Sequence, residues 1–319
     1  MEIAGRTYTN TGKGVSTMKL LSVGLTGVTQ DVTARLQRDC GSLLHEGFRI
    51  VIDEISKGKY TFVGCSITEG ELSFRNYERV KDALKTYVAK IIADFILNWE
   101  ERKLIRRFIV RRYDYFSKEE QDQIYDNSLQ LLSSNPVVLR EFGLQERRRR
   151  IMTRIMDYFD HHHELVVDGF VQFRLKDYRE NLGRIVEKAA DDFMMALEYK
   201  EYVRVLRYFI STQESQVPEA HVVIHHSQFF SILDAYGKAL EHQYSHAVAA
   251  CNPNDLDYED LLITALVTLS PYRVIIHNPC NIGALNMVNT VCEVFENRSV
   301  MCQGCELCLE SIAYTVDSD

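Results

Sequence analysis

The pattern of apolar and polar positions is clearest in the stretch that follows Tyr178. Apolar side chains recur there at steps of three and four residues as far as Ile210. Such steps place apolar side chains along one stripe of a helix. The pattern predicts one long helix, or two helices that separate near residues 196–199, and Pro218 lies beyond the end as a stop signal.

The segment in front of this helix has a different pattern. Asp168-Gly169 is a turn dipeptide, because glycine tolerates a positive φ. Phe170–Leu175 is short, rich in β-formers and partly alternating, which predicts an extended segment. Asp177 is then expected at the N-cap of the long helix, with Glu180 completing a capping-box-like pair.

The first part of the chain predicts a small β-α-β-β unit. Three β-rich runs and one run with helical spacing occur here. Lys57-Gly58 is a turn signal for a hairpin between the last two β-rich runs. The expected elements are a strand at 19–25, a helix at 31–44 and strands at 48–54 and 60–67.

Residues 76–159 show helical spacing almost throughout. The pattern predicts a first helix over 76–113, a second over 118–132 and a third over 136–159. Ser117 and Glu120 form a capping-box pair in front of the second helix, and Pro136 is a start signal for the third.

After Pro218 the pattern changes to short β-rich runs between helical ones. Residues 221–226 and 229–233 are expected as strands, with a turn at Asp234–Gly237. A helix over 227–250, which would place His242 and His246 one turn apart as metal ligands, is the less favoured alternative. The remaining elements are a helix at 258–269, a strand at 272–277, a helix at 283–295 and a strand at 299–302.

Together these patterns predict a mixed α/β (α+β) protein that is mostly helical. Its C-terminal helix–strand–helix–strand order implies at least one parallel strand pair and hence a partly parallel sheet. The expected regions are a disordered lead at 1–17, a small α/β unit at 18–72, a helical region at 73–164, a core segment with the long helix at 165–216 and a C-terminal α/β unit with a cysteine-rich tail at 217–319.

Composition adds limits on the class of protein. The chain of 319 residues is 46% hydrophobic and 26% charged, with a net charge of −8, which is ordinary for a globular protein and argues against wholesale coating of nucleic acid. No apolar run reaches the ~20 residues of a membrane helix. The first residues lack a signal-peptide pattern, so we expect a cytoplasmic protein whose ordered part begins at Met18.

Three evenly spaced cysteines near the end carry the best candidate chemistry. Cys302, Cys305 and Cys308 form a C-x2-C-x2-C run that can hold zinc or part of an iron–sulfur cluster. If strands 272–277 and 299–302 are parallel neighbours, His277 or Cys280 would lie close enough to complete the ligand set. The alternative is a group of buried thiols or a redox-sensitive tail.

Two groups of basic residues are candidate anion sites. Arg174 and Lys176 would share one face of an extended segment beside a helix N-terminus. A basic helix with interleaved aromatics could bind nucleic acid, although neighbouring acids favour a salt-bridged surface. That helix carries Arg102, Lys103, Arg106, Arg107, Arg111 and Arg112. No nucleophile or carboxylate constellation indicates a reaction, so the sequence leaves open whether the protein is an enzyme.

Three stretches resemble a known family. They are GFVQFRLKDY at 169–178, EYKEYVRVLRYFISTQE at 198–214 and DLLITALVTLSPYRVIIHN at 260–278, and they are similar to the YtxC-like family, described as sporulation proteins. The resemblance implies a spore-forming bacterial source and a cytoplasmic protein, but no substrate. Our leading interpretation is therefore a sporulation-associated binding or regulatory protein. A nucleic-acid or phosphate-ligand binder and a metal- or iron–sulfur-dependent protein are the alternatives, and a protein partner or a homo-oligomer would fit the long amphipathic helices.

Overall fold

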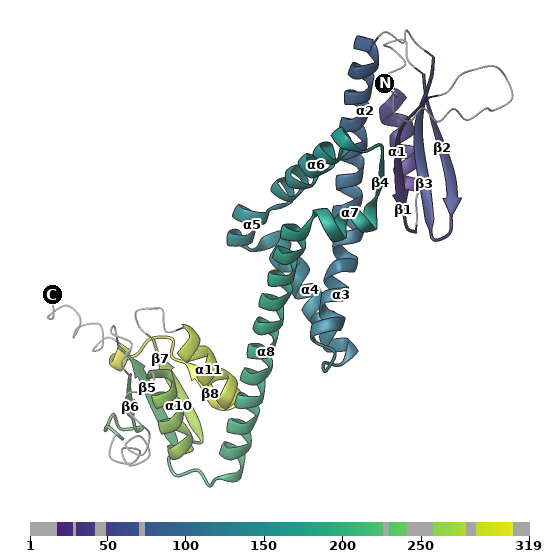
Figure 1. Cartoon of the computed structure of the whole chain (residues 1–319). Coiled ribbons are helices and arrows are strands. Elements are labelled where there is room, and N and C mark those ends of the chain that lie inside the picture. The colour runs from purple at the N-terminus through teal and green to yellow at the C-terminus, as the bar shows by residue number, and fades with distance from the viewer. Residues whose placement is uncertain are drawn as a thin grey trace. The chain divides into compact units, whose positions relative to one another are not determined.

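A computed structural model describes residues 18–27, 30–41, 49–69, 74–225, 230–240, 258–278 and 285–308 (Figure 1). It divides the chain into two compact units, Met1–Phe193 and Met194–Asp319. Each unit has its own cluster of buried apolar side chains. The lead expected at residues 1–17 lies outside the described residues.

The first unit is built on a four-stranded sheet of order β2-β3-β1-β4. β1 (Met18–Leu25) pairs antiparallel with β3 (Tyr60–Glu69), which pairs antiparallel with β2 (Arg49–Lys57). The predicted turn between β2 and β3 is confirmed, since Gly58 has a φ of 62° that favours glycine. Helix α1 (Gln30–Cys40) buries Val32 and Leu36. The predicted β-α-β-β order is therefore observed.

The fourth strand of this sheet was not predicted. β4 (Glu164–Val166) has only three residues and pairs parallel with β1, about 140 positions earlier in the chain. So short a run has no periodicity of its own. Only the packing of distant segments makes it a strand.

Helices make up the rest of the first unit. α2 (Phe74–Phe95) continues through a π-helical turn, η2 (Ile96–Glu100), into α3 (Glu101–Arg112), and α4 (Lys118–Ser134) follows. The capping box predicted from Ser117 and Glu120 is confirmed, because each side chain accepts a hydrogen bond from the other residue's backbone N–H.

The single helix predicted over 136–159 is wrong. The chain forms α5 (Pro136–Phe142) and α6 (Leu144–His161) instead, separated by Gly143. Gly143 is extended, with a ψ of 162°, and a Cβ there would meet the carbonyl oxygen of Leu139 at 2.4 Å. A close backbone approach that only glycine permits therefore breaks the helix.

The extended segment predicted at Phe170–Leu175 is also wrong. These residues lie in or just after helix α7 (Val167–Arg174), and Asp168-Gly169 is part of that helix and not a turn. Burial of Val167, Phe170 and Val171 on one side of α7 outweighs their β-propensity. α8 (Lys176–Thr212) then runs without the break considered near 196–199, and Asp177 lies in its first turn and not at its N-cap.

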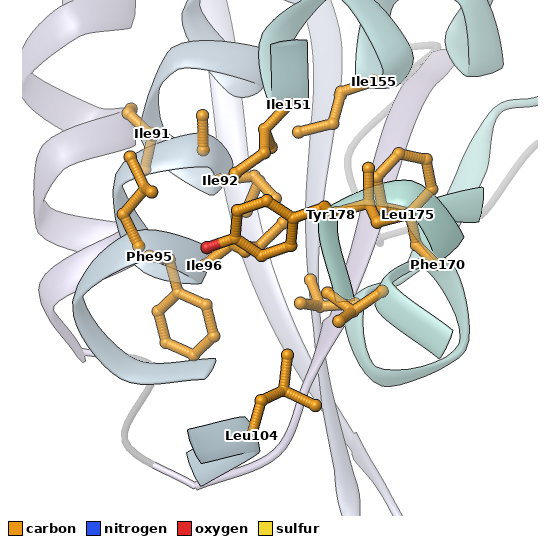
Figure 2. Close-up of a cluster of buried hydrophobic side chains, with 14 of the residues drawn as sticks. Ile91, Ile92, Phe95, Ile96, Leu104, Ile151, Ile155, Phe170, Leu175 and Tyr178 are labelled. Carbon is orange, nitrogen blue, oxygen red and sulfur yellow. The ribbon is translucent and has the colours of Figure 1, made fainter. Parts of the chain in front are cut away.

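The core of the first unit joins α2, η2, α6 and α7 around the start of α8. Figure 2 shows the Tyr178 ring in the middle of this cluster, among Ile92, Ile96 and Leu175. Its hydroxyl donates to the buried carboxylate of Glu101, and Arg147 Nε lies 3.3 Å from the same carboxylate. Each fully buried side chain of this size stabilises the fold by about 1.5–3 kcal/mol.

The second unit contains a mixed sheet of order β6-β5-β7-β8. β5 (Glu219–Ile224) pairs antiparallel with β6 (Phe230–Leu233) and parallel with β7 (Arg273–His277), and β7 pairs parallel with β8 (Ser299–Met301). The predicted hairpin, the turn ending at Gly237 (φ 77°) and the partly parallel sheet are confirmed.

Two helices connect the parallel strands of this sheet. α10 (Tyr258–Leu269) precedes β7 and α11 (Leu285–Phe295) precedes β8, as the sequence predicts. Both connections step in the same direction across the sheet, so right-handed crossovers put both helices on one face. Contact between α10 and α11 agrees with this arrangement (Figure 1). In the described part of the chain, no helix is long and apolar enough to span a membrane.

Candidate metal centre

The carboxyl ends of β7 and β8 meet at one edge of the second sheet. β7 ends at His277, and Cys302 follows the last residue of β8. The backbone N–H of Cys302 donates to the carbonyl oxygen of Ile276 over 2.9 Å, which extends the ladder by one step. Parallel pairing therefore brings the imidazole of His277 beside the start of the cysteine run.

The loop after β8 folds all three thiols back toward His277. Gly304 has a φ of 122°, which only glycine adopts readily, and its N–H points at the Cys302 sulfur over 3.4 Å. A helical turn then carries Cys308 to the side of Cys305. As a result, the ligand atoms of His277, Cys302, Cys305 and Cys308 all lie within 4.8 Å of one another.

The distances in this cluster match the edges of one small tetrahedron. Cys308 Sγ lies 3.8 Å from Cys302 Sγ and 3.9 Å from Cys305 Sγ, and His277 Nδ1 lies 3.4 Å from the sulfurs of Cys305 and Cys308. Zinc bound at its usual bond lengths would put tetrahedral sulfurs about 3.8 Å apart, and sulfur and nitrogen about 3.5 Å apart. The four ligands of an iron–sulfur cluster are shared among two or more irons, so they cannot all lie on one small tetrahedron. The spacing therefore fits a single ion.

A hydrogen-bonded chain orients the His277 ring. His277 Nε2 lies 2.9 Å from His221 Nδ1, and His221 Nε2 lies 3.0 Å from Glu219 Oε1. Because side chains alternate along a strand, Glu219 and His221 share one face of β5, and the parallel register puts His277 of β7 on that face too. Arg273 Nη1 lies 3.6 Å from the second oxygen of Glu219. These hydrogen bonds occupy Nε2 of His277 and leave its Nδ1 facing the thiols.

Burial and hydrogen bonding set the protonation of the four groups. Burial, helped by His221, lowers the pKa of His277, so its ring is neutral near pH 7 and Nδ1 has a free lone pair. Burial also raises the pKa of Cys308 to about 11. For Cys305, burial acts in the same direction, but hydrogen bonds from the Cys308 backbone and from neighbouring thiols outweigh it and lower the pKa. Cys305 therefore forms a thiolate more readily than Cys308.

The structure brings four of the five candidate metal ligands together. Cys280, the fifth, lies outside the described residues, as do His242 and His246. The other described cysteines, Cys40, Cys65 and Cys292, are free thiols away from the cluster. Sequence reasoning missed the support from Glu219 and His221. Their i, i+2 spacing on a β-rich run was the signal that could have found them.

Three of the six candidate cations of helix α3 lie in ion pairs. Lys103 Nζ lies 2.7 Å from Glu100, Arg106 lies 2.8 Å from Asp122 and stacks on Tyr125, and Arg112 lies 3.9 Å from Glu187. Arg102, Arg107 and Arg111 are exposed. The second basic run, at the start of α6, is paired as well, by Glu101, Asp94 and Glu146. The pairing therefore takes up part of the positive charge of the two basic runs.

The extended segment expected to carry Arg174 and Lys176 on one face is not present. Arg174 is the last residue of α7, and its guanidinium lies 5.8 Å from the centre of the Tyr158 ring. Lys176 is the first residue of α8 and is exposed. Since the segment between them is not extended, the two side chains do not share a strand face.

The fold and the cluster define a two-unit, mostly helical α/β protein with a Cys₃His group at a sheet edge. The profile of the YtxC-like family matches residues 86–300, about two thirds of the chain, and the chain belongs to this family. It is 21% identical over 220 residues to "Uncharacterized protein YtxC" of Bacillus subtilis (strain 168), which covers 68% of this chain and 77% of that protein. No solved structure matches the chain. The family match includes His221 and His277 and ends just before Cys302.

Proposed function

We propose that the second unit binds one zinc ion through His277 Nδ1 and the thiolates of Cys302, Cys305 and Cys308. The observation that supports this most directly is the agreement of four interatomic distances with four of the six edges of a tetrahedral zinc site, all six edges being within 4.8 Å. Sulfur and imidazole ligands suit zinc better than magnesium or calcium, which prefer oxygen.

The proposed role of the ion is structural. Three thiolates and one imidazole fill all four positions of tetrahedral zinc, which is the pattern of closed sites and leaves no position for a reacting water. The ion would fasten the segment after β8 to the end of β7. In this proposal the chain is a binding or regulatory protein that presents a zinc-stabilised unit, and it is not a hydrolase.

The cellular setting is part of the same proposal. Thiolate ligands need a reducing compartment, and the described cysteines are free, which fits a cytoplasmic protein. The family resemblance supports a role during sporulation. A nucleic-acid role through α3 stays a weaker alternative, because three of its six candidate cations are already paired with acids. Its expected signature is binding that falls steeply with salt.

Metal analysis of protein purified under reducing, anaerobic conditions tests the proposal. We expect about one zinc per chain, as one closed site requires. The zinc content should fall to a small fraction of one per chain in each of four separate variants, Cys302→Ser, Cys305→Ser, Cys308→Ser and His277→Ala. The matched control is Cys292→Ser, a half-buried free thiol in α11, which should keep full zinc.

Two results would count against a zinc site. Zinc and iron far below one per chain in the unaltered protein would remove the metal proposal altogether. Stoichiometric iron with acid-labile sulfide, and visible absorption lost in the cysteine variants, would replace the single ion by an iron–sulfur cluster.

A further inference from the structure

The first unit contains a recess that is independent of the proposed zinc site. It has a volume of about 360 Å³ and lies where the β2–β3 turn, the start of α3, α7 and α8 come together. This volume is in the range of small-molecule sites, about 300–1,000 Å³. The argument rests on the charged residues of its lining, which are Lys59, Glu100, Arg107, Asp168 and Arg179.

Among the residues that the structure describes, the three cations of the recess have no carboxylate partner. In the part of the chain that the structure describes, no ion pair reaches Lys59, Arg107 or Arg179. The two acids are already engaged, since Glu100 pairs with Lys103 over 2.7 Å and Asp168 accepts from Thr26 Oγ1 over 3.1 Å. The charged side chains that line the recess therefore leave it with a net positive charge.

Arg179 adds an unmet hydrogen-bond donor. Its Nη1 donates to the carbonyl oxygen of Gln172 over 3.0 Å, which anchors the guanidinium to the end of α7. Its Nε is buried and has no acceptor among the described residues. A buried donor without a partner costs about 1–3 kcal/mol. A ligand oxygen is one way to satisfy it.

We propose that this recess binds a small phosphorylated ligand. Two planar guanidinium groups and one ammonium suit the oxygens of a phosphate group, which accept paired hydrogen bonds from arginine. Tyr60 and the exposed ring of Phe173 also line the recess and offer apolar surface to the organic part of the ligand. The negative charge of the bound phosphate would neutralise the unpaired cations of the recess.

Calorimetric titration of the full-length protein with inorganic phosphate, pyrophosphate and phenyl phosphate tests this proposal. We expect saturable binding, with phenyl phosphate binding more tightly than inorganic phosphate because of the aromatic lining. Arg107→Gln and Lys59→Gln should each weaken it about ten- to hundredfold, the effect of losing a hydrogen bond to a charged group. Arg179→Lys, which keeps the charge but loses the forked donor, should also weaken it.

The matched control is Arg111→Gln, one turn further along α3 and not part of the recess lining. The affinity of this variant for the three phosphate probes should stay within about twofold of that of the unaltered protein, because an exposed charge outside the recess is screened by salt. No saturable binding of any of the three probes would overturn the proposal. So would an equal loss in Arg107→Gln and Arg111→Gln, because that pattern indicates general surface attraction. Neither result depends on whether the second unit holds zinc.

Discussion

The hydrogen bond between His277 Nε2 and His221 Nδ1 decides which ring nitrogen of His277 faces the three thiols. A ligand histidine held in this way keeps one tautomer and one ring orientation, and the hydrogen bond raises the basicity of the nitrogen that binds the metal. The cysteine spacing predicted the thiol part of the cluster. The expected parallel pairing of β7 and β8 also proposed His277 as a ligand, whereas its support by His221 needed the register between β5 and β7.

This support gives a prediction for zinc affinity. His221→Ala should weaken zinc binding about 10- to 100-fold without abolishing it, because the ligands remain while their orientation is lost. Competition with a chromogenic chelator measures the change. His225→Ala is the matched control, since His225 follows the same strand but bonds to Ser231. If His221→Ala lost as much zinc affinity as His277→Ala, the role of His221 would not be purely orienting.

A second residue-scale prediction concerns the buried carboxylate of Glu101. Burial raises its pKa, although Arg147 and Tyr178 act in the opposite direction. A carboxyl whose pKa is raised by folding binds its proton more tightly in the folded state, so its contribution to stability falls as the pH rises from the unfolded value of about 4.3 through the folded pKa.

Urea unfolding of the native protein and of Glu101→Gln across this pH range measures the effect. The free energy of unfolding of the native protein should decline relative to that of the variant as the pH rises, because glutamine cannot titrate. A constant difference between the two proteins would show that the pKa of Glu101 does not change on folding.

At the scale of elements, helix starts are encoded locally and can be tested locally. Ser117→Ala should destabilise the first unit by about 1 kcal/mol, since it removes the side-chain acceptor of the capping box at α4. Thermal or urea unfolding measures this. Ser133→Ala in the same helix is the control, because its hydroxyl only bonds back to Leu129 and Gln130. If both variants lost the same free energy of unfolding, the capping box at α4 would contribute nothing to stability.

Elements that depend on distant partners were predicted poorly. The run at 170–175 has β-propensity, yet it forms part of α7 because that helix buries Phe170 and Val171 in the core. β4 is a strand only because β1 pairs with it. By contrast, α10, β7 and α11 have patterns long or apolar enough to be recognised, and the structure confirms them.

At the scale of the whole molecule, the chain has two separate cores, and the proposed zinc site belongs to the smaller one. Binding of an ion to the folded state alone stabilises that state, by about 2.7 kcal/mol when the ion is at 100 times its dissociation constant. The effect should therefore concentrate in the second unit.

Hydrogen exchange measured by mass spectrometry, with and without a strong chelator, tests this expectation. Chelation should speed exchange in β5 and β7 and leave the buried part of α2 unchanged, and added zinc should restore the protection. Equal acceleration in both units would mean that they unfold as one. No acceleration in β5 and β7 would mean that the cluster does not contribute to their stability.

The sequence by itself determined the mixed, mostly helical class, the β-α-β-β start and the parallel order near the end, because these follow from local periodicity, caps and turn residues. The tertiary structure decided the breaks at Gly143 and Leu175, the pairing of basic residues with distant acids, and the support that His221 and Glu219 give to the ring of His277. Those features depend on which surfaces pack together, and no local pattern in the chain records that.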